Sequence, residues 1–299
     1  MTIKRADVKV WFACNNHCSF CVQWDKRNKF KPRKLKEIKD ILDKEYNSWA
    51  EYVVFTWWEP TVHPDLVESV RYAKKIWYKQ IQIQSNWTNF SKEDYTKDLI
   101  EAWVTEFSPS IHWFHRETHD KQVNNIWAWD KIIKWIILLK KLNQYIIMNS
   151  VITQSNYKEI PELATLLTKL WVNQFQFAFV HILWSADKNK KTVVPKKSDV
   201  IPYIHKALDI AKKNQKKVYT EAIPYCLMQW YEWAIAENIM PETSVHDAES
   251  FIESYADYRW NEWKAKREEC KKCKQYKYCE WPWKEYPEMY WWDEFKPII

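Results

Sequence analysis

The chain has 299 residues, of which 46% are hydrophobic and 28% charged, a composition typical of a globular protein with one large and one small domain. This composition excludes collagen, coiled-coil and disordered proteins. The formal net charge is +7, and no apolar run approaches the ~18 residues of a membrane span, which excludes a membrane-spanning protein. The first residues, Met1 to Asp7, contain no apolar signal-like stretch, so we expect a cytoplasmic protein.

Stretches rich in Val, Ile, Phe and Tyr alternate with amphipathic helical stretches up to about residue 215. In chain order we expect strands at 6–12, 51–56, 80–85, 105–111, 144–152 and 173–180. Helices are expected at 33–48, 65–76, 92–102, 124–142, 158–170 and 197–214. This order predicts an α/β fold with parallel strands, as a partial (β/α)6 TIM-like barrel or an open doubly wound sheet.

Beyond residue 215 the alternation stops. The tail contains four of the seven cysteines, many aromatic residues and a lysine-rich stretch from Lys264 to Lys277. We therefore expect a core domain over residues 1–215 and a small cysteine-rich domain over 216–299 that is held by metal rather than by a large core.

The glycine and tryptophan contents are abnormal. The chain has 0 Gly and 22 Trp, whereas average usage predicts roughly 21 glycines. Trp77, Trp103 and Trp171 each follow a predicted helix, where a left-handed glycine commonly ends the helix. Trp87 follows Asn86, where an Asn-Gly turn would be natural.

We interpret most of these tryptophans as standing at glycine positions. A stop codon reassigned to glycine but translated as tryptophan would produce this pattern, as would deliberate substitution. Trp129 and Trp283 are candidates for genuine tryptophans. The alternative is a truly tryptophan-rich protein, which would place bulky side chains where positive φ is required.

Three cysteines, Cys14, Cys18 and Cys21, follow the first predicted strand with the spacing C-x3-C-x2-C. Disulfides are rare in cytosolic proteins, so the spacing indicates a metal site rather than a set of buried free thiols. Structural zinc takes four protein ligands. Three thiolates instead suit a [4Fe–4S] cluster with one iron left open.

Other polar residues also follow predicted strands, at the end of a parallel sheet where chemistry gathers. After the second strand comes a segment of four residues, Trp57, Trp58, Glu59 and Pro60. The next three predicted strands place further polar residues at or near their ends, namely Asn86, Ser110 and Asn149.

The cysteine loop, with Phe20 before its last cysteine, and the Trp57–Pro60 segment in the place of a GGEP motif together resemble the radical S-adenosylmethionine (radical SAM) superfamily over residues 6–185. With glycine read for tryptophan the GGEP match is complete; as printed, it departs at Trp57 and Trp58. The resemblance implies an oxidoreductase or maturase in which Cys14, Cys18 and Cys21 act as catalytic cluster ligands.

The resemblance also implies the chemistry and the cofactor contacts. One electron from the [4Fe–4S] cluster cleaves S-adenosylmethionine, and the resulting 5′-deoxyadenosyl radical abstracts hydrogen from a substrate. A flavodoxin- or ferredoxin-type protein is the implied electron donor. Phe20 would pack near the adenine, the segment Trp57–Pro60 with Glu59 would bind the methionine amino group, and Ser110 and Asn149 would bind carboxylate and ribose, with Asn86 as a further contact.

The other four cysteines are Cys226, Cys270, Cys273 and Cys279. Four thiolates allow a closed zinc site or a fully ligated auxiliary [4Fe–4S] cluster. Their spacing resembles the auxiliary-cluster tail of SPASM and Twitch radical SAM proteins, with the shorter, single-cluster Twitch form fitting better. We favour a second iron–sulfur cluster, with zinc as the alternative.

The sequence leaves the substrate open. We favour a peptide or protein side chain, with a small molecule or nucleotide in cofactor synthesis as the alternative. From another class, a non-catalytic iron–sulfur or zinc protein that binds nucleic acid would use the same cysteines. Much of the basic content, 46 residues against 39 acidic, comes from dispersed lysines such as those between Lys188 and Lys197, and we see no stripe of alternating aromatic and basic residues, so we expect neither a nucleic-acid nor a membrane partner.

Three histidines, His112, His115 and His119, lie close together in the sequence just before Asp120. They have the ligand types of a mononuclear metal site, but their spacing suits no single helix face. We interpret them as solvated or substrate-lining residues.

Overall fold

The computed structural model describes residues 3–299 except 24–25, 28, 57–58 and 87–92. Its strands form a six-stranded sheet in the order β4-β3-β2-β1-β8-β9 and a three-stranded sheet in the order β5-β6-β7. The strands are β1 Lys4–Lys9, β2 Tyr52–Thr56, β3 Gln80–Ser85, β4 Glu106–Pro109, β5 Ile147–Ile152, β6 Gln174–Phe179, β7 Lys217–Glu221, β8 Glu242–His246 and β9 Phe251–Ile252.

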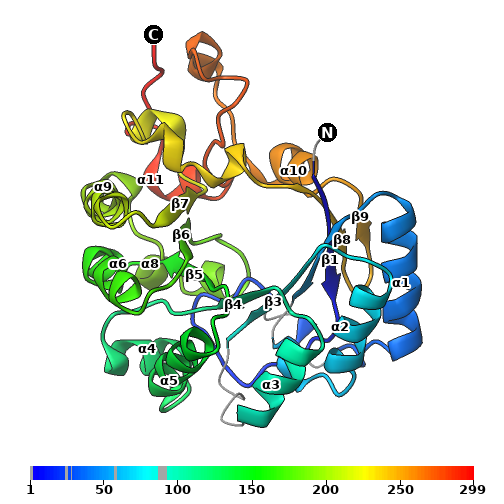
Figure 1. Cartoon of the computed structure of the whole chain (residues 1–299). Helices are drawn as coiled ribbons and strands as arrows, with labels where there is room; N and C mark the ends of the chain where they lie inside the picture. The colour runs from blue at the N-terminus through cyan, green and yellow to red at the C-terminus, as the bar shows by residue number, and fades with distance from the viewer. Residues whose placement is uncertain (1–2, 24–25, 28, 57–58, 87–92) are drawn as a thin grey trace.

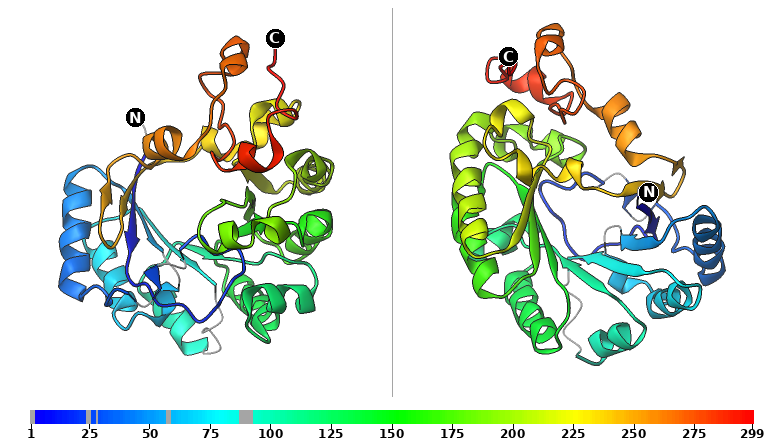
Figure 2. Two further views of the ribbon diagram at one scale, coloured as in Figure 1. Left: turned by 180° about the vertical axis from the view of Figure 1, so that it is seen from behind. Right: turned by 45° about the horizontal axis from the view of Figure 1, so that its top comes forward.

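Helices cover the outer side of the curved sheet (Figure 1). The helices of the described residues are α1 Leu35–Asn47, α2 Leu66–Lys75, α3 Glu93–Glu101, α4 Arg116–Val123, α5 Ala128–Lys141, α6 Ile160–Lys169, α7 Ser185–Lys188, α8 Lys190–Val193, α9 Lys197–Lys213, α10 Tyr255–Tyr258 and α11 Tyr286–Tyr290, of which α10 and α11 belong to the C-terminal segment. Figure 2 shows the same arrangement from two further sides, with the C-terminal segment (orange to red) at one end of the barrel. Within the described part of the chain, no helix has both the length and the apolar character that crossing a membrane requires.

The two sheets are continuous. Isolated parallel bridges join Phe107 to Ile146 and Ser110 to Asn149, so β4 lies beside β5. Strands β1 to β7 therefore follow one another in sequence order around a curve, without the reversal of order that a doubly wound sheet requires. The expected partial TIM-like barrel is confirmed, and the doubly wound alternative is wrong.

All the predicted strands and helices occur, with small shifts at their ends, but further elements were not predicted. The stretch 124–142 forms α5, and α4 precedes it. The expected domain boundary at residue 215 falls between α9 and β7. Both β7 and β8 pair in parallel with barrel strands, β7 with β6 and β8 with β1.

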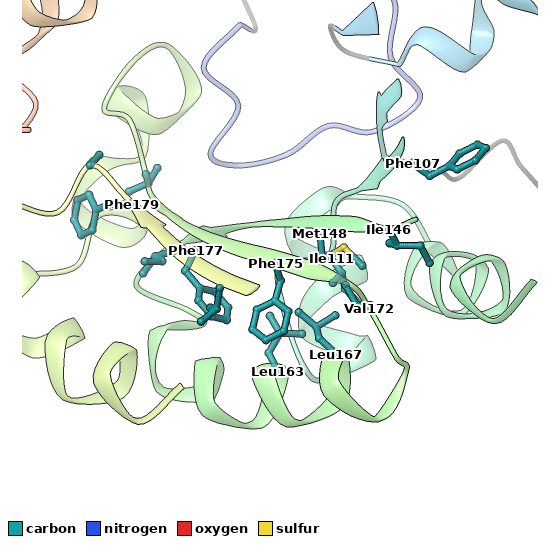
Figure 3. Packing of buried hydrophobic residues seen from close by; sticks show 14 of the residues in the cluster. Phe107, Ile111, Ile146, Met148, Leu163, Leu167, Val172, Phe175, Phe177 and Phe179 are labelled. Carbon is teal, nitrogen blue, oxygen red and sulfur yellow. The ribbon is translucent and has the colours of Figure 1, made fainter. Parts of the chain in front are cut away.

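Buried and half-buried residues alternate along β6, which shows that the two faces of the sheet differ. Phe175, Phe177 and Phe179 are buried, and Figure 3 shows Phe175 lying against Leu163 and Leu167 of α6. Burying one such side chain contributes about 1.5–3 kcal/mol. The intervening residues face the other way, into the barrel, since side chains alternate across a strand. The inward face of β6 is therefore mainly polar, and there the Gln176 side-chain amide donates a 2.6 Å hydrogen bond to Glu221.

Tryptophans make up most of the described residues whose backbone has a positive φ. Trp77, Trp103 and Trp171 have φ values of 75°, 84° and 57°, as their positions after helices predict. Trp87 lies outside the described residues. The remaining described tryptophans with positive φ are Trp49, Trp127, Trp184, Trp230, Trp281 and Trp291. All of these nine except Trp281 are exposed, so most of them stand where the backbone favours glycine and where the indole lies at the surface.

Candidate functional site

Neighbouring segments fix the loop that follows β1 and carries Cys14, Cys18 and Cys21. Two backbone amides of this loop donate to the end of α4, His17 to the Val123 carbonyl at 2.8 Å and Ser19 to the Gln122 carbonyl at 3.0 Å. The Ser185 amide of α7 donates to the Cys21 carbonyl at 3.1 Å. Hydrogen bonds with α4 and with α7 therefore fix the conformation of the cysteine loop, as a preorganised site requires.

The three thiols of this loop lie within electrostatic range of one another. Burial, above all, raises the pKa of Cys14 to about 12, and a nearby Cys21 adds to the rise. Burial likewise raises the pKa of Cys18, followed by the effects of Cys21 and Cys14. Thiols that hinder one another's ionisation in this way become thiolates when a metal centre supplies the missing positive charge.

Nitrogen donors already face one of these sulfurs. The Asn16 amide nitrogen lies 3.4 Å from Cys14 Sγ, and the Asn86 side-chain amide lies 3.3 Å from the same atom. The Asn86 side chain also donates to Asn15 Oδ1 at 2.8 Å. Donors of this kind stabilise a thiolate ligand and tune the cluster that it holds.

Glu59 is a buried carboxylate that joins the ends of β2 and β3. It accepts hydrogen bonds from the Asn86 amide at 2.7 Å, from the Thr61 amide at 3.1 Å and from the hydroxyls of Ser85 and Thr61. Burial raises its pKa despite these donors. The carboxylate thus holds Asn86, which in turn contacts Cys14. Pro60 is buried beside it, whereas Trp57 and Trp58 lie outside the described residues.

Ser110 and Asn149 lie side by side, since a parallel bridge joins them across β4 and β5. The Ser110 amide donates to the Ser85 carbonyl at 3.1 Å. Asn149 Oδ1 is buried and has no hydrogen-bond partner among the described residues. An unsatisfied buried acceptor costs about 1–3 kcal/mol, so it suits a ligand that brings a hydroxyl or amine donor. The site fits S-adenosylmethionine in this respect.

Phe20 forms an aromatic cluster behind the cysteine loop, with ring centroids 4.9 Å from His112 and 5.5 Å from Trp113. His112 Nδ1 accepts from the Val151 amide at 3.0 Å, and its ring stacks on His119 at 6.1 Å. His115 is exposed at the start of α4. The structure therefore brings two of the three histidines together as buried, stacked rings.

The other four cysteines meet at a second place. Cys226, Cys270, Cys273 and Cys279 line one pocket whose wall includes Trp281, Trp292 and Phe295. Burial raises the pKa of Cys226 to about 12 and the pKa of Cys279 to about 11, and neighbouring cysteines add to both. The Ile298 amide lies 3.3 Å from Cys273 Sγ. Among the described residues, no group of three or more His, Cys, Asp or Glu is arranged to hold a single metal ion.

Sequence reasoning missed a buried ionic network beside this pocket. Arg259 pairs with Glu221 of β7 at 3.0 Å, with Glu237 at 3.2 Å and with Glu280. Lys264 also pairs with Glu280, the residue after Cys279. Burial and then Glu280 raise the pKa of Glu237 to about 8. The network ties the last barrel strand to the segment that carries the second set of cysteines.

Residues 8–167 match the family model of the radical SAM superfamily. The chain therefore belongs to this superfamily and is an enzyme of the class, which uses S-adenosylmethionine and a [4Fe–4S] cluster.

Curated relatives include the probable GTP 3′,8-cyclases of Saccharolobus islandicus and Saccharolobus solfataricus, each 26% identical. The first match covers 56% of this chain and 54% of the relative, so the chain spans about half the length of the curated relatives that it matches.

Two solved structures share the fold over more of the chain. Streptococcus suis SuiB bound to S-adenosylmethionine has a TM-score of 0.70 at 15% identity and covers 92% of this chain and 72% of its own. Native anSMEcpe with bound AdoMet has a TM-score of 0.60 at 17% identity and covers 73% of this chain and 64% of its own. At these identities the likeness concerns the fold.

Proposed function

We propose that this enzyme cleaves S-adenosylmethionine reductively at a [4Fe–4S] cluster held by Cys14, Cys18 and Cys21, and that it abstracts hydrogen from a peptide side chain. The observation that carries the proposal is the mutual proximity of these thiols on a loop fixed by α4 and α7. Three protein thiolates leave one iron of such a cluster for the cofactor.

Cys14, Cys18 and Cys21 would hold the cluster, and the bound group would supply the difficult chemistry, namely reductive cleavage of S-adenosylmethionine and removal of a hydrogen atom from the substrate. The chain positions the reactants. Asn86 holds the Cys14 sulfur, and Glu59 holds Asn86 through a 2.7 Å hydrogen bond. Asn149 Oδ1, a buried acceptor without a protein partner among the described residues, would accept a hydrogen bond from the cofactor.

We also propose that the second set of cysteines holds an auxiliary [4Fe–4S] cluster, with a four-thiolate zinc site as the alternative. Four cysteines around one pocket with aromatic walls support it. Fully ligated clusters of this kind are held by four cysteine thiolates.

The fold likeness supports a peptide substrate. SuiB bound to its precursor peptide SuiA has a TM-score of 0.65 and covers 94% of this chain, which includes much of the cysteine-rich tail. A nucleotide is the second candidate, because the curated relatives are named probable GTP 3′,8-cyclases. That match extends over only 56% of the chain.

Anaerobic reconstitution tests the reaction. The protein with iron, sulfide, dithionite and S-adenosylmethionine should form 5′-deoxyadenosine, measured by liquid chromatography and mass spectrometry. Cys18→Ala should abolish this product, since the cluster loses one of its three ligands. His17→Ala is the matched control, because the His17 side chain is exposed in the same loop and the substitution retains the hydrogen bond from its backbone amide to the Val123 carbonyl of α4. Product formation by Cys18→Ala at the parent rate would contradict the assignment.

Adding GTP to the same assay separates the two substrate classes. A peptide-modifying enzyme should show no acceleration of 5′-deoxyadenosine formation and no cyclised nucleotide. A cyclised nucleotide product would replace the peptide proposal with the nucleotide one.

A further inference from the structure

The segment between the cysteine loop and α1 is the most basic part of the chain. Residues 26–36, named here the basic segment, contain seven Lys or Arg and no Asp or Glu. This excess equals the net charge of the whole chain, +7. Outside the basic segment, basic and acidic residues are therefore equal in number, and the net positive charge is concentrated beside the cysteine loop.

Three side chains anchor the basic segment. Arg27 donates to the Asn16 carbonyl at 2.7 Å and to the Cys14 carbonyl, which binds the segment directly to the cysteine loop. Lys26 pairs with Asp247 at 3.0 Å, and Arg33 Nε donates to the Lys9 carbonyl at 3.0 Å. The backbone of the segment is thereby held against the end of β1.

The other four side chains point to solvent. Lys29, Lys31, Lys34 and Lys36 are exposed, and none has a carboxylate partner within the part of the chain that the structure describes. Acidic residues flank the segment on both sides: Asp25 lies outside the described residues, and Glu37 accepts a hydrogen bond from the Lys34 backbone amide at 2.6 Å at the start of α1. Within the described residues, four exposed lysines without a carboxylate partner therefore create a positive surface on an anchored backbone.

The function that we infer for this positive surface follows from its position beside the cysteine loop. The cysteine loop is where an electron must enter under the proposed function, and all three of its cysteines are partly exposed. Rates of encounter between oppositely charged surfaces rise by about 10 to 10³-fold through electrostatic steering. We propose that Lys29, Lys31, Lys34 and Lys36 form the docking surface for an acidic one-electron carrier protein of the flavodoxin or ferredoxin class.

This inference rests on the proposed function. In the step, the carrier loses one electron and the cluster gains it, and no bond forms or breaks. The lysine-rich stretch near the second set of cysteines is a weaker candidate, because it contains Glu268 and Glu269 and its Lys271 pairs with Glu268 at 2.8 Å. The only aromatic residue of the basic segment, Phe30, packs on Phe12 at 5.1 Å, so it offers no stacking surface to nucleic acid.

The test compares two reductants in the reconstituted full-length enzyme. One variant carries Lys29→Glu, Lys31→Glu, Lys34→Glu and Lys36→Glu. The matched control changes four exposed lysines on α5 and α9 with no resolved role, namely Lys134→Glu, Lys141→Glu, Lys206→Glu and Lys213→Glu. Formation of 5′-deoxyadenosine is measured with dithionite and, separately, with an acidic flavodoxin kept reduced by its NADPH-dependent reductase.

We expect the docking variant to lose about 10-fold or more in flavodoxin-driven rate at low salt, to keep its dithionite-driven rate, and to lose the salt dependence of the parent. The control should match the parent in both assays. Equal flavodoxin-driven rates in the two variants would overturn the docking surface. Absence of dithionite-driven product in the parent would instead overturn the proposed function. Tight binding of a labelled RNA that these four substitutions abolish, with unchanged flavodoxin-driven rates, would assign the lysines to nucleic acid.

Discussion

At the residue scale, the tryptophans divide into two groups by backbone and environment. Trp230 and Trp49 have positive φ and are 87% and 82% exposed, so nothing offsets the clash between Cβ and the following carbonyl. Trp135 is buried, and its indole N–H donates to Thr96 Oγ1 at 2.7 Å. The first group has the properties of glycine positions, and the second those of genuine core tryptophans.

Replacing one residue from each group tests this division. Trp77→Gly should stabilise the protein by about 1–2 kcal/mol, because it removes a left-handed bulky residue. Trp135→Gly should destabilise it by about 3–5 kcal/mol, as expected for the loss of a buried aromatic side chain. Free energies of unfolding from denaturant titration measure both. Destabilisation by Trp77→Gly would argue that this tryptophan is native.

The stacked histidines behind the cysteine loop predict an acid-sensitive fold. Burial lowers the pKa of His112 and of His119 below the ordinary value of 6.5. Below that pH the unfolded chain binds a proton that the folded chain does not. The contribution of these two histidines to the free energy of unfolding is therefore fully present above pH 6.5. It is lost as the pH falls, by up to ~1.4 kcal/mol per pH unit for each histidine.

His119→Phe should weaken this dependence, since neither ring nitrogen of His119 has a hydrogen-bond partner among the described residues. The Asp120 carboxylate lies 3.6 Å from His119 Nδ1, so the substitution removes this contact but no hydrogen bond. His115→Phe, at the exposed start of α4, should leave the dependence unchanged. Free energies of unfolding at about pH 7 and about pH 5 provide the comparison. An unaltered slope in His119→Phe would exclude this histidine as a source.

At the scale of elements, periodicity predicted those segments that bury a regular apolar face. The strand β6 alternates phenylalanine with small or polar residues, and its predicted and observed bounds nearly coincide. Helix α4 was not predicted because its eight residues bury only His119 and Val123, which leaves no apolar stripe to recognise. Strand β8 was missed because its partner β1 lies far away in the sequence, as the register of Asp7 with Val245 shows.

The iron and zinc content of the protein tests which metal the second cysteine pocket holds. Two [4Fe–4S] clusters would give about eight irons per chain, whereas one cluster with zinc would give about four. We expect Cys273→Ser to lower the iron content by about half while the site at Cys14, Cys18 and Cys21 keeps its cluster. Elemental analysis of anaerobically reconstituted protein measures this. About four irons plus one zinc in the parent would assign the pocket to zinc.

At the scale of the whole molecule, contacts between distant segments complete both sites. Cys226 belongs to the chain just after β7, yet it shares a pocket with Cys270 and Cys273. The Arg259 network spans β7 and the tail, and removing one partner of its buried Arg259–Glu280 pair costs several kcal/mol. The cysteine-rich tail is thus anchored to the barrel, and its position is fixed relative to β7.

The amino-acid sequence by itself determined the order of strands and helices and the two groups of cysteines, because burial periodicity and ligand spacing are local properties of a chain. Only the tertiary structure decided that Glu59 holds Asn86 against Cys14, that Asn149 is left without a partner among the described residues, and that the basic segment is anchored beside the cysteine loop. These arrangements depend on which strands lie next to one another when the barrel curves, and short-range patterns carry no record of that.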